Sequence, residues 1–378
     1  MSGQKTDYRF KLLYALGMIF VVAGHAGNGG VSFFYNWFPP YAFHLGLFAF
    51  ASGYFYRRGS ETQAGKFLWK KVRTLLLPMY AWNVFYGLLV ALLRRWGFDL
   101  LWPQHITLKS LLLLPLTSGH QFGLNLGGWF VAPLFMLHVW NVLTRKGFRA
   151  VFGENYSEWL VYAVDLILGL AGIWLSAKGY YKGYWVVLSR LTYFLPFYAL
   201  GGLYKEKLEK HDTLPNVWYF AIVLLCQLIV IYRHGWAVSY TPAWCDDFTD
   251  GPFLPVIVGY LGIAFWLRAA RLLEPSIGRS RIVTAIADNT YAIMLHQFLG
   301  FMAVKTGYAL LNHFLGVCEG FDWVAYKTDL WYYYAPHDIY EAYILYLLAG
   351  LFLPLLIQKG VELVKTAAAR RLPKKMKA

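Results

Sequence analysis

The sequence predicts an all-α membrane protein, a bundle of about ten transmembrane helices with both termini in the cytoplasm. Three observations predict this fold class. Hydrophobic residues make up 58% of the 378 residues, and charged residues make up 15%, against about 25% in soluble domains. Long apolar runs recur along the whole length. Lysine and arginine lie mainly at the ends of these runs, and they are more numerous in every second segment that connects two runs.

The apolar runs follow one another without a linker or an internal repeat, so we expect a single membrane domain over residues 1–378. The first run lacks a small-residue cleavage pattern and is therefore interpreted as a span. The run at 108–119 is too short to span and contains Pro115, so we expect it to be interfacial or re-entrant. The expected spans are residues 9–27, 38–56, 73–93, 127–144, 158–177, 184–204, 215–233, 252–273, 284–310 and 339–364.

The distribution of positive charge predicts the orientation. With the N-terminus inside, 26 of the 35 Lys and Arg residues fall in cytoplasmic segments. The basic tail at 369–378 then predicts a lipid-headgroup anchor. The net charge of +15 does not indicate nucleic-acid binding, because the basic residues lie at the ends of apolar runs. Three cysteines without CxxC spacing give no metal signature, so no metal site is predicted.

Two histidines are the first candidates for chemistry. His25 ends the run that Arg9 and Lys11 begin, about 25 Å further along a helix. His44 lies near the outer end of the second expected span, and the short loop between the spans makes them antiparallel neighbours. Two imidazoles at one depth indicate a polar cavity, and histidine is the usual general base for an alcohol. The alternative is a structural contact between the histidines or with backbone carbonyls.

Five segments in order resemble a known family, the acyltransferase-3 membrane acyltransferases. FHLGLFAFASGY (43–54) is similar to the family's second-span signature, and AGH ending at His25 is similar to its first span. The other matching segments are KKVRTLLLPMYAW (70–82), GGWFVAPLF (127–135) and NTYAIMLHQFL (289–299). Each motif is weakly specific, but the ordered set covers effectively the whole chain.

The resemblance implies an enzyme of the bacterial inner membrane that moves an acyl group, most often acetyl, from cytoplasmic acyl-CoA to a sugar hydroxyl of a cell-surface glycan or glycolipid. It carries the family's first-span histidine onto His25, with His44 as its candidate catalytic partner, and the family's basic pair onto Lys70 and Arg73. One position departs from the pattern. Where many members have an arginine eleven residues before the histidine, this chain has Tyr14.

A cytoplasmic donor site is also indicated by charge. Basic side chains crowd the loop after the second span and the start of the third, where they could hold the phosphates of an acyl-CoA such as acetyl-CoA. Positive-inside topology alone explains the same cluster, which is the alternative. No glycine-rich phosphate loop is present. The candidate donor-binding residues are Arg57, Arg58, Lys70, Lys71 and Arg73, with Arg9 and Lys11 as substitutes for the charge missing at Tyr14.

Acceptor-binding candidates lie deeper in the spans or in the outer loops. Arg190 faces the bundle or extends to the interface, and Tyr291 and His296 line a cavity or pack in the core. Asn125 and Trp129 complete these candidates. The outer loops at 236–250 and 311–338 are rich in aromatic and acidic residues, which suits a sugar or an interfacial aromatic belt. Each loop carries one cysteine, Cys245 and Cys318, which could form a disulfide in an oxidising compartment.

The composition also fits a transporter or flippase of a glycan precursor. Such proteins often have repeated, interrupted half-helices, and none are visible here. A non-catalytic sensor or scaffold would explain neither histidine. The sequence therefore favours an O-acyltransferase with an acyl-CoA donor, a glycan or glycolipid acceptor, and the lipid bilayer as its surroundings. It says nothing of the oligomeric state.

Overall fold

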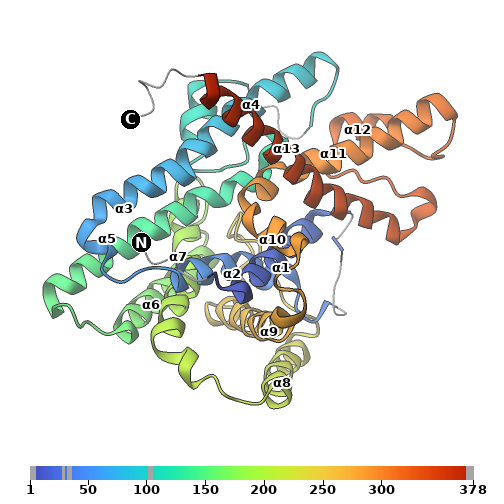
Figure 1. Cartoon of the computed structure of the whole chain (residues 1–378). Coiled ribbons are helices and arrows are strands. Elements are labelled where there is room, and N and C mark those ends of the chain that lie inside the picture. Colours follow the sequence, from blue (N-terminus) through green and yellow to red (C-terminus); the bar gives the residue numbers. More distant parts are fainter. Residues whose placement is uncertain (1–5, 28–29, 32–35, 101–104, 372–378) are drawn as a thin grey trace.

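The computed structural model describes residues 6–27, 30–31, 36–100 and 105–371, and these are all-helical (Figure 1). Most of the basic tail and Lys5 lie outside the described residues. The α-helices are α1 (Tyr8–His25), α2 (Pro40–Tyr54), α3 (Ala64–Lys71), α4 (Leu77–Arg95), α5 (Val131–Phe152), α6 (Glu158–Ala177), α7 (Trp185–Leu203), α8 (Asn216–His234), α9 (Phe253–Ile277), α10 (Arg281–Asp288), α11 (Thr290–Leu315), α12 (Trp323–Thr328) and α13 (Tyr343–Arg371).

In the described part of the chain, seven helical stretches are long and apolar enough to cross a membrane. The predicted number of about ten spans is therefore not confirmed. The other three expected spans do form helices, but α2 has only 15 residues, and α1 and α11 are not among the seven. The seven stretches are Ser60–Arg95, Gly123–Phe152, Glu158–Ala177, Trp185–His211, Asn216–His234, Phe253–Ile277 and Tyr340–Ala367.

Two expected boundaries differ from the structure. The third span was expected to begin at residue 73, but the helix already begins with α3 at Ala64 and continues through a π-helical turn at Val72–Leu76 into α4. The ninth was expected as one run over 284–310, but it is divided at Asn289 into α10 and α11. The Asn289 side-chain amide donates to the Ala285 carbonyl, 2.8 Å away, and so ends α10.

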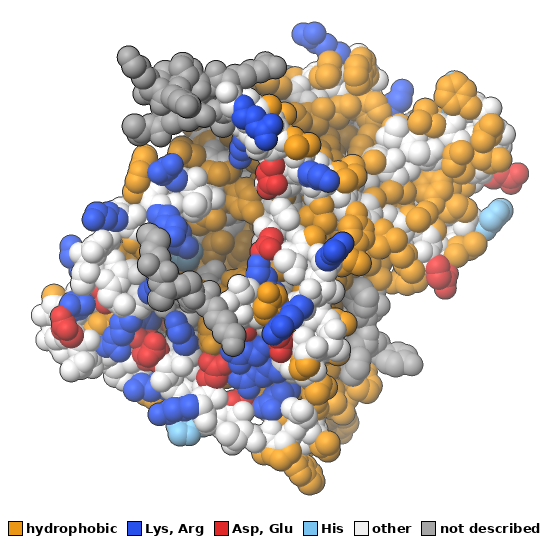
Figure 2. Space-filling model, in the orientation of Figure 1, with side chains coloured by type: hydrophobic (Ala, Val, Ile, Leu, Met, Phe, Trp, Pro, Cys, Tyr) orange, Lys and Arg blue, Asp and Glu red, His pale blue; other side chains and the backbone are white. Residues whose placement is uncertain are grey.

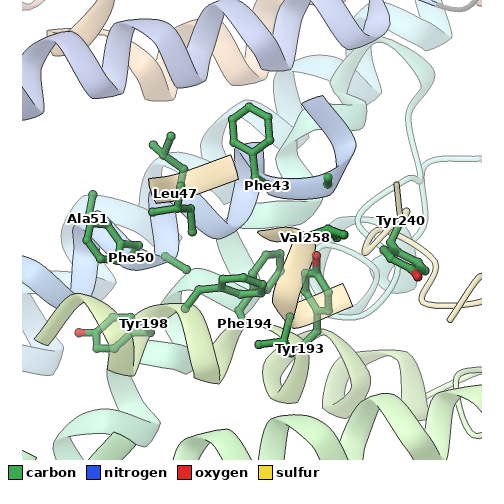
Figure 3. Close-up of a cluster of buried hydrophobic side chains, with 14 of the residues drawn as sticks. Phe43, Leu47, Phe50, Ala51, Tyr193, Phe194, Tyr198, Tyr240 and Val258 are labelled. Carbon is green, nitrogen blue, oxygen red and sulfur yellow. The ribbon is translucent and has the colours of Figure 1, made fainter. Parts of the chain in front are cut away.

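Helix α2 lies at the centre of the core, packed between α1, α7 and α9. Figure 3 shows Phe43, Leu47 and Phe50 of α2 in one buried cluster with Phe194 and Tyr198 of α7. Phe43 itself packs against Phe20 of α1 and Trp266 of α9, with ring centroids 5.4 Å and 6.4 Å away. Close approach of α2 and α7 requires glycine, because a Cβ at Gly53 would lie 1.8 Å from the Tyr198 carbonyl oxygen. Small residues allow the same close packing between helices in membranes generally. The Ser-Gly of the second-span motif therefore positions α2 against α7.

Charged side chains gather at one end of the bundle, around the start of α1 (Figure 2). Arg9 binds Glu209 at 2.8 Å, and Lys11 pairs with Asp288, so α1 is tied to the segment after α7 and to the end of α10. All four residues belong to or adjoin the segments predicted to be cytoplasmic. These segments therefore share one end of the molecule, and its assignment to the cytoplasm stays a prediction.

The cysteines do not form the disulfide considered from the sequence. Cys245 and Cys318 are both free in the structure. Cys245 is fully buried, and its thiol faces the Pro242 carbonyl oxygen at 3.3 Å. Burial raises the pKa of the Cys245 thiol to about 12, so it is protonated at neutral pH.

Candidate active site

A cavity of about 220 Å³ lies where α1 ends and α2 begins. It contains both histidines selected from the sequence, His25 and His44, as expected for adjacent antiparallel helices. Trp129, a candidate for acceptor binding, also lines it. Its remaining lining residues are Val21, Tyr41, Leu45, His120, Leu126, Gly127, Phe130, Thr241, Pro242, Ala243, Trp244, Met294, Gln297 and Trp331.

The last turn of α1 sets the protonation state of His25. Its Nδ1 lies 2.8 Å from the Val21 carbonyl oxygen, one turn earlier. Because a carbonyl can only accept a hydrogen bond, Nδ1 must carry the hydrogen. The other ring nitrogen, Nε2, is then left unprotonated in the neutral ring. His25 is therefore held in the tautomer that a general base requires.

His44 is held in the same way in the first turn of α2. Its Nδ1 donates to the Pro40 carbonyl, four residues earlier, and its side chain is 3% exposed. The Tyr41 ring lies edge-on to both imidazoles, with centroids 5.9 Å from His25 and 5.2 Å from His44. The two histidines and the Tyr41 hydroxyl thus form the polar part of the cavity lining that α1 and α2 contribute.

The same cavity is lined by a third histidine, His120, which sequence reasoning missed. His120 stacks on Trp244 at 4.3 Å and lies nearly parallel to Trp129 at 6.3 Å. Its Nδ1 is buried and makes no hydrogen bond with the described residues. Burial, together with the positive charge of Arg190, lowers the pKa of His120 to about 3, so the ring is neutral. In the sequence, His120 directly follows the short apolar run at 108–119. A histidine directly after an apolar run that is too short to span is the signal that could have identified it as a site residue.

Gln297 was also missed, although it directly follows His296 in a matched segment. The side chain is fully buried, lies beside the His25 ring, and lines the cavity. Its Nε2 donates to the Met294 carbonyl at 3.2 Å, while its Oε1 makes no hydrogen bond within the described residues. An unsatisfied buried amide oxygen in a cavity indicates a position for a donor group of a ligand.

Arg190 fixes the wall that carries His120. It is 2% exposed, and its guanidinium donates to the carbonyls of Thr117 (2.7 Å), Ser118 (3.0 Å) and Ala243 (3.0 Å). Arg190 was selected as a substrate-binding residue, but it lies behind the cavity lining and holds two loops together.

The turn between Ser118 and His120 depends on glycine. Gly119 has a positive φ of 71°, and a Cβ there would lie 2.4 Å from the Cα of Trp129. A side chain at this position would therefore be strained and would also clash. Glycine thus allows His120 to lie close to Trp129.

A second buried cation fixes the outer loop after α12. Lys305 of α11 is 1% exposed, and its ammonium group donates to the Leu330 carbonyl and lies 4.9 Å from the Tyr333 ring centroid. The Tyr333 hydroxyl donates to the His25 carbonyl. Trp331, which lies between Leu330 and Tyr333 in the sequence, stacks on the His25 ring with centroids 6.0 Å apart. The loop after α12 thereby covers one face of the His25 ring.

A second cavity, of about 310 Å³, adjoins the first. Val21, Leu45, Phe130 and Met294 line both cavities, so the two cavities are neighbours on either side of these four side chains. At its other end the second cavity reaches Thr74 and Leu75, in the π-helical turn that joins α3 to α4. π-helical turns often occur at functional sites.

The predicted donor-binding residues divide into two groups. Lys70 and Arg73 are exposed and lie within one helical turn of Thr74, which lines the second cavity, but neither of them lines it. Lys71 is half-buried beside the Phe67 ring. Arg58 instead donates to the Glu154 carbonyl at 2.8 Å and stacks on Tyr156 at 4.2 Å, as part of the packing at this end of the bundle.

None of the predicted donor-binding residues lines either of these two cavities. Arg57 is exposed, and Arg9 is held by Asp7 and Glu209. Lys11 lines a third cavity, of about 370 Å³, at the inner end of α1. Tyr14 lines both the second and third cavities, so the position that departs from the family's arginine lies between them.

The other acceptor-binding candidates lie away from His25. Tyr291 lines the second cavity, and its hydroxyl donates to the Leu75 carbonyl at 3.0 Å. His296 is fully buried outside the lining, with its Nδ1 2.7 Å from the Tyr86 hydroxyl. Asn125 is buried in the turn before Trp129, and its side-chain oxygen makes no hydrogen bond with described residues.

Among the described residues, no three His, Cys, Asp or Glu side chains are grouped so that they could hold a metal ion. A family model described as an acyltransferase domain matches residues 7–357, nearly the whole chain. The chain belongs to the acyltransferase-3 family. No curated protein and no solved structure matches it significantly.

Membership of the acyltransferase-3 family, together with the apolar helices, makes this chain a multi-pass membrane acyltransferase. The family match does not favour the transporter hypothesis. It covers α1 through most of α13, and therefore includes every residue of the histidine cavity and of the cavity that adjoins it.

Proposed function

We propose that this protein is an O-acyltransferase of a bacterial inner membrane that moves an acetyl group from cytoplasmic acetyl-CoA to a sugar hydroxyl of a cell-surface glycan or glycolipid. One observation carries the proposal: two neighbouring cavities that share four lining residues occupy the space between Thr74, close to Lys70 and Arg73, and His25. A pantetheine arm is long and narrow, so a thioester could reach His25 while the nucleotide stays at the basic residues. Arginine and lysine are the usual partners of such phosphates.

In this proposal His25 acts as the general base. Its Nε2 takes the proton of the acceptor hydroxyl, and the oxygen attacks the thioester carbonyl carbon. The tetrahedral intermediate collapses as the carbon–sulfur bond breaks, and the protonated His25 returns its proton to the CoA thiolate. The products are the ester and free CoA. A covalent acyl-histidine would require the same residue as nucleophile, and the hydrogen bond from Nδ1 to Val21 suits both routes.

The test uses purified protein in lipid nanodiscs with radiolabelled acetyl-CoA. The acceptors are methyl glycosides of glucose, galactose, mannose and N-acetylglucosamine, and the readout is labelled ester. We expect transfer by the wild-type protein and a loss of about 10²–10⁴-fold in His25→Ala, the range for a general base. His313→Ala is the matched control, because His313 is exposed and lies outside both cavities. Full activity of His25→Ala would exclude the mechanism.

A further inference from the structure

Part of the histidine cavity is lined by residues that have no part in the proposed donor path. His120, Thr241 and Trp244 line the histidine cavity but not the neighbouring cavity that Thr74 lines. Val21, by contrast, lines both cavities and lies one turn before His25. With His25 as the end of the proposed donor path, the side of the cavity lined by His120, Thr241 and Trp244 is left for the second substrate.

Three features show that the fold builds this wall around the imidazole of His120. The ring lies between Trp244 and Trp129, so its plane is fixed. Arg190, buried at a cost in desolvation, holds both loops of the wall through backbone carbonyls. Trp244 is 39% exposed, so the wall reaches from the cavity to the surface of the protein.

The hydrogen-bonding state of His120 points to a ligand. Its Nδ1 is buried and makes no hydrogen bond with the described residues, whereas the Nδ1 atoms of His25 and His44 each face a carbonyl of their own helix. A buried nitrogen without a hydrogen-bond partner destabilises the folded protein. A bound hydroxyl would remove this destabilisation, because a neutral imidazole accepts a hydrogen bond at one nitrogen and donates at the other.

We propose that His120 is the acceptor-binding residue of the cavity, and that its Nδ1 holds an acceptor hydroxyl in the cavity that it shares with His25. This inference rests on the proposed acyl transfer and adds a second histidine to it. His120 gains and loses no proton in the reaction. Its hydrogen bond orients the acceptor oxygen toward the thioester carbon while His25 removes the proton. Orientation of this kind lowers the barrier without a change in charge.

The test compares three substitutions at one position in the nanodisc assay, with the methyl glycoside that the wild-type protein acetylates fastest as probe. Asparagine places an amide near the position of Nδ1, and glutamine places one near Nε2. We expect His120→Ala and His120→Gln to raise the acceptor KM about tenfold, the effect of one hydrogen bond of roughly 1.4 kcal/mol. His120→Asn should keep a KM close to that of wild type. The KM for acetyl-CoA should not change in any of the three.

Hydrolysis of acetyl-CoA without an added acceptor serves as the internal control, because it uses His25 and the donor path alone. It should proceed equally in wild type and in the three variants. An unchanged acceptor KM in His120→Ala, or an equal rise in the KM values for both substrates, would overturn the role of His120 alone. Absence of transfer by the wild-type protein would overturn the proposed function and this inference with it.

Discussion

The guanidinium carbon of Arg190 lies 4.7 Å from the centroid of the Trp129 ring, between two loops that are more than a hundred residues apart in sequence. The contact is a cation–π interaction, and the same guanidinium donates to carbonyls of both loops. A charge buried in this way is costly unless every donor has a partner. The position of the His120 wall relative to Trp129 therefore depends on this one side chain.

Arg190→Lys should detach one of the two loops, because an ammonium group cannot reach all the carbonyls that a planar guanidinium binds. We expect the acceptor KM to rise about 10-fold or more, since at least one charged hydrogen bond worth roughly 1.5–3 kcal/mol is lost. The KM for acetyl-CoA should stay within about twofold, because Arg190 lies far from the donor path. A rise in the donor KM alone would contradict this account.

The reactivity of the Cys245 thiol measures whether the loop that contains Ala243 keeps its position, without an assay of activity. Its thiol is buried, and burial raises the pKa of Cys245 to about 12, so the thiolate that reacts with maleimide is scarce at neutral pH. We expect Cys245 to resist labelling in the wild-type protein and to react after denaturation. In Arg190→Lys it should react in the folded protein, as measured by peptide mass spectrometry. Equal protection in both proteins would show that the loop does not need Arg190.

The donor path can be blocked from α5. Val131 is 1% exposed and lines the second cavity but not the histidine cavity. Val131→Phe should fill this space and reduce turnover of acetyl-CoA about tenfold or more, in addition to an overpacking cost of about 1–3 kcal/mol in stability. Val142→Phe is the control, since Val142 is fully buried on the same helix and lines neither cavity. Similar losses in both variants would contradict a donor path here.

The basic residues close to Thr74 should affect donor binding alone. Lys70→Ala and Arg73→Ala should each raise the KM for acetyl-CoA about 3- to 10-fold, consistent with a partly solvated phosphate contact of roughly 1 kcal/mol. Raised salt should weaken donor binding in the wild-type protein for the same reason. Arg58→Ala should instead lower thermal stability, because Arg58 binds the Glu154 carbonyl and stacks on Tyr156. A donor KM unchanged in both Lys70→Ala and Arg73→Ala would place the phosphates elsewhere.

The sequence predicted the part of this site that two consecutive helices form. His25 and His44 could be paired because a short loop joins these two adjacent helices. His120 lies in a loop and Gln297 lies on α11, and neither could be paired with them, because contacts between segments distant in sequence leave no periodic signal. Arg190 was recognised as exceptional, but its partners are backbone carbonyls, and no side-chain pattern marks these.

The number of spans was the weaker part of the fold prediction. Apolar runs located all the long helices, since periodicity and length are local properties. Whether a short helix such as α2 crosses the membrane depends on the helices that surround it, and α2 is covered by α1, α7 and α9. The break at Asn289 depends on one side-chain hydrogen bond, which hydropathy does not detect.

The loop that carries Trp331 has a consequence for biosynthesis. The histidine cavity needs Val21 from α1, Trp244 from the middle of the chain, and Trp331 from a loop that the ribosome makes shortly before α13. The growing chain therefore inserts most of its helices while the polar groups around His25 still lack this loop. A stop codon after α11 would leave a protein with nearly all of its helices but an unfinished cavity. Membrane insertion and formation of the site are consequently separate events, and the second awaits the end of translation.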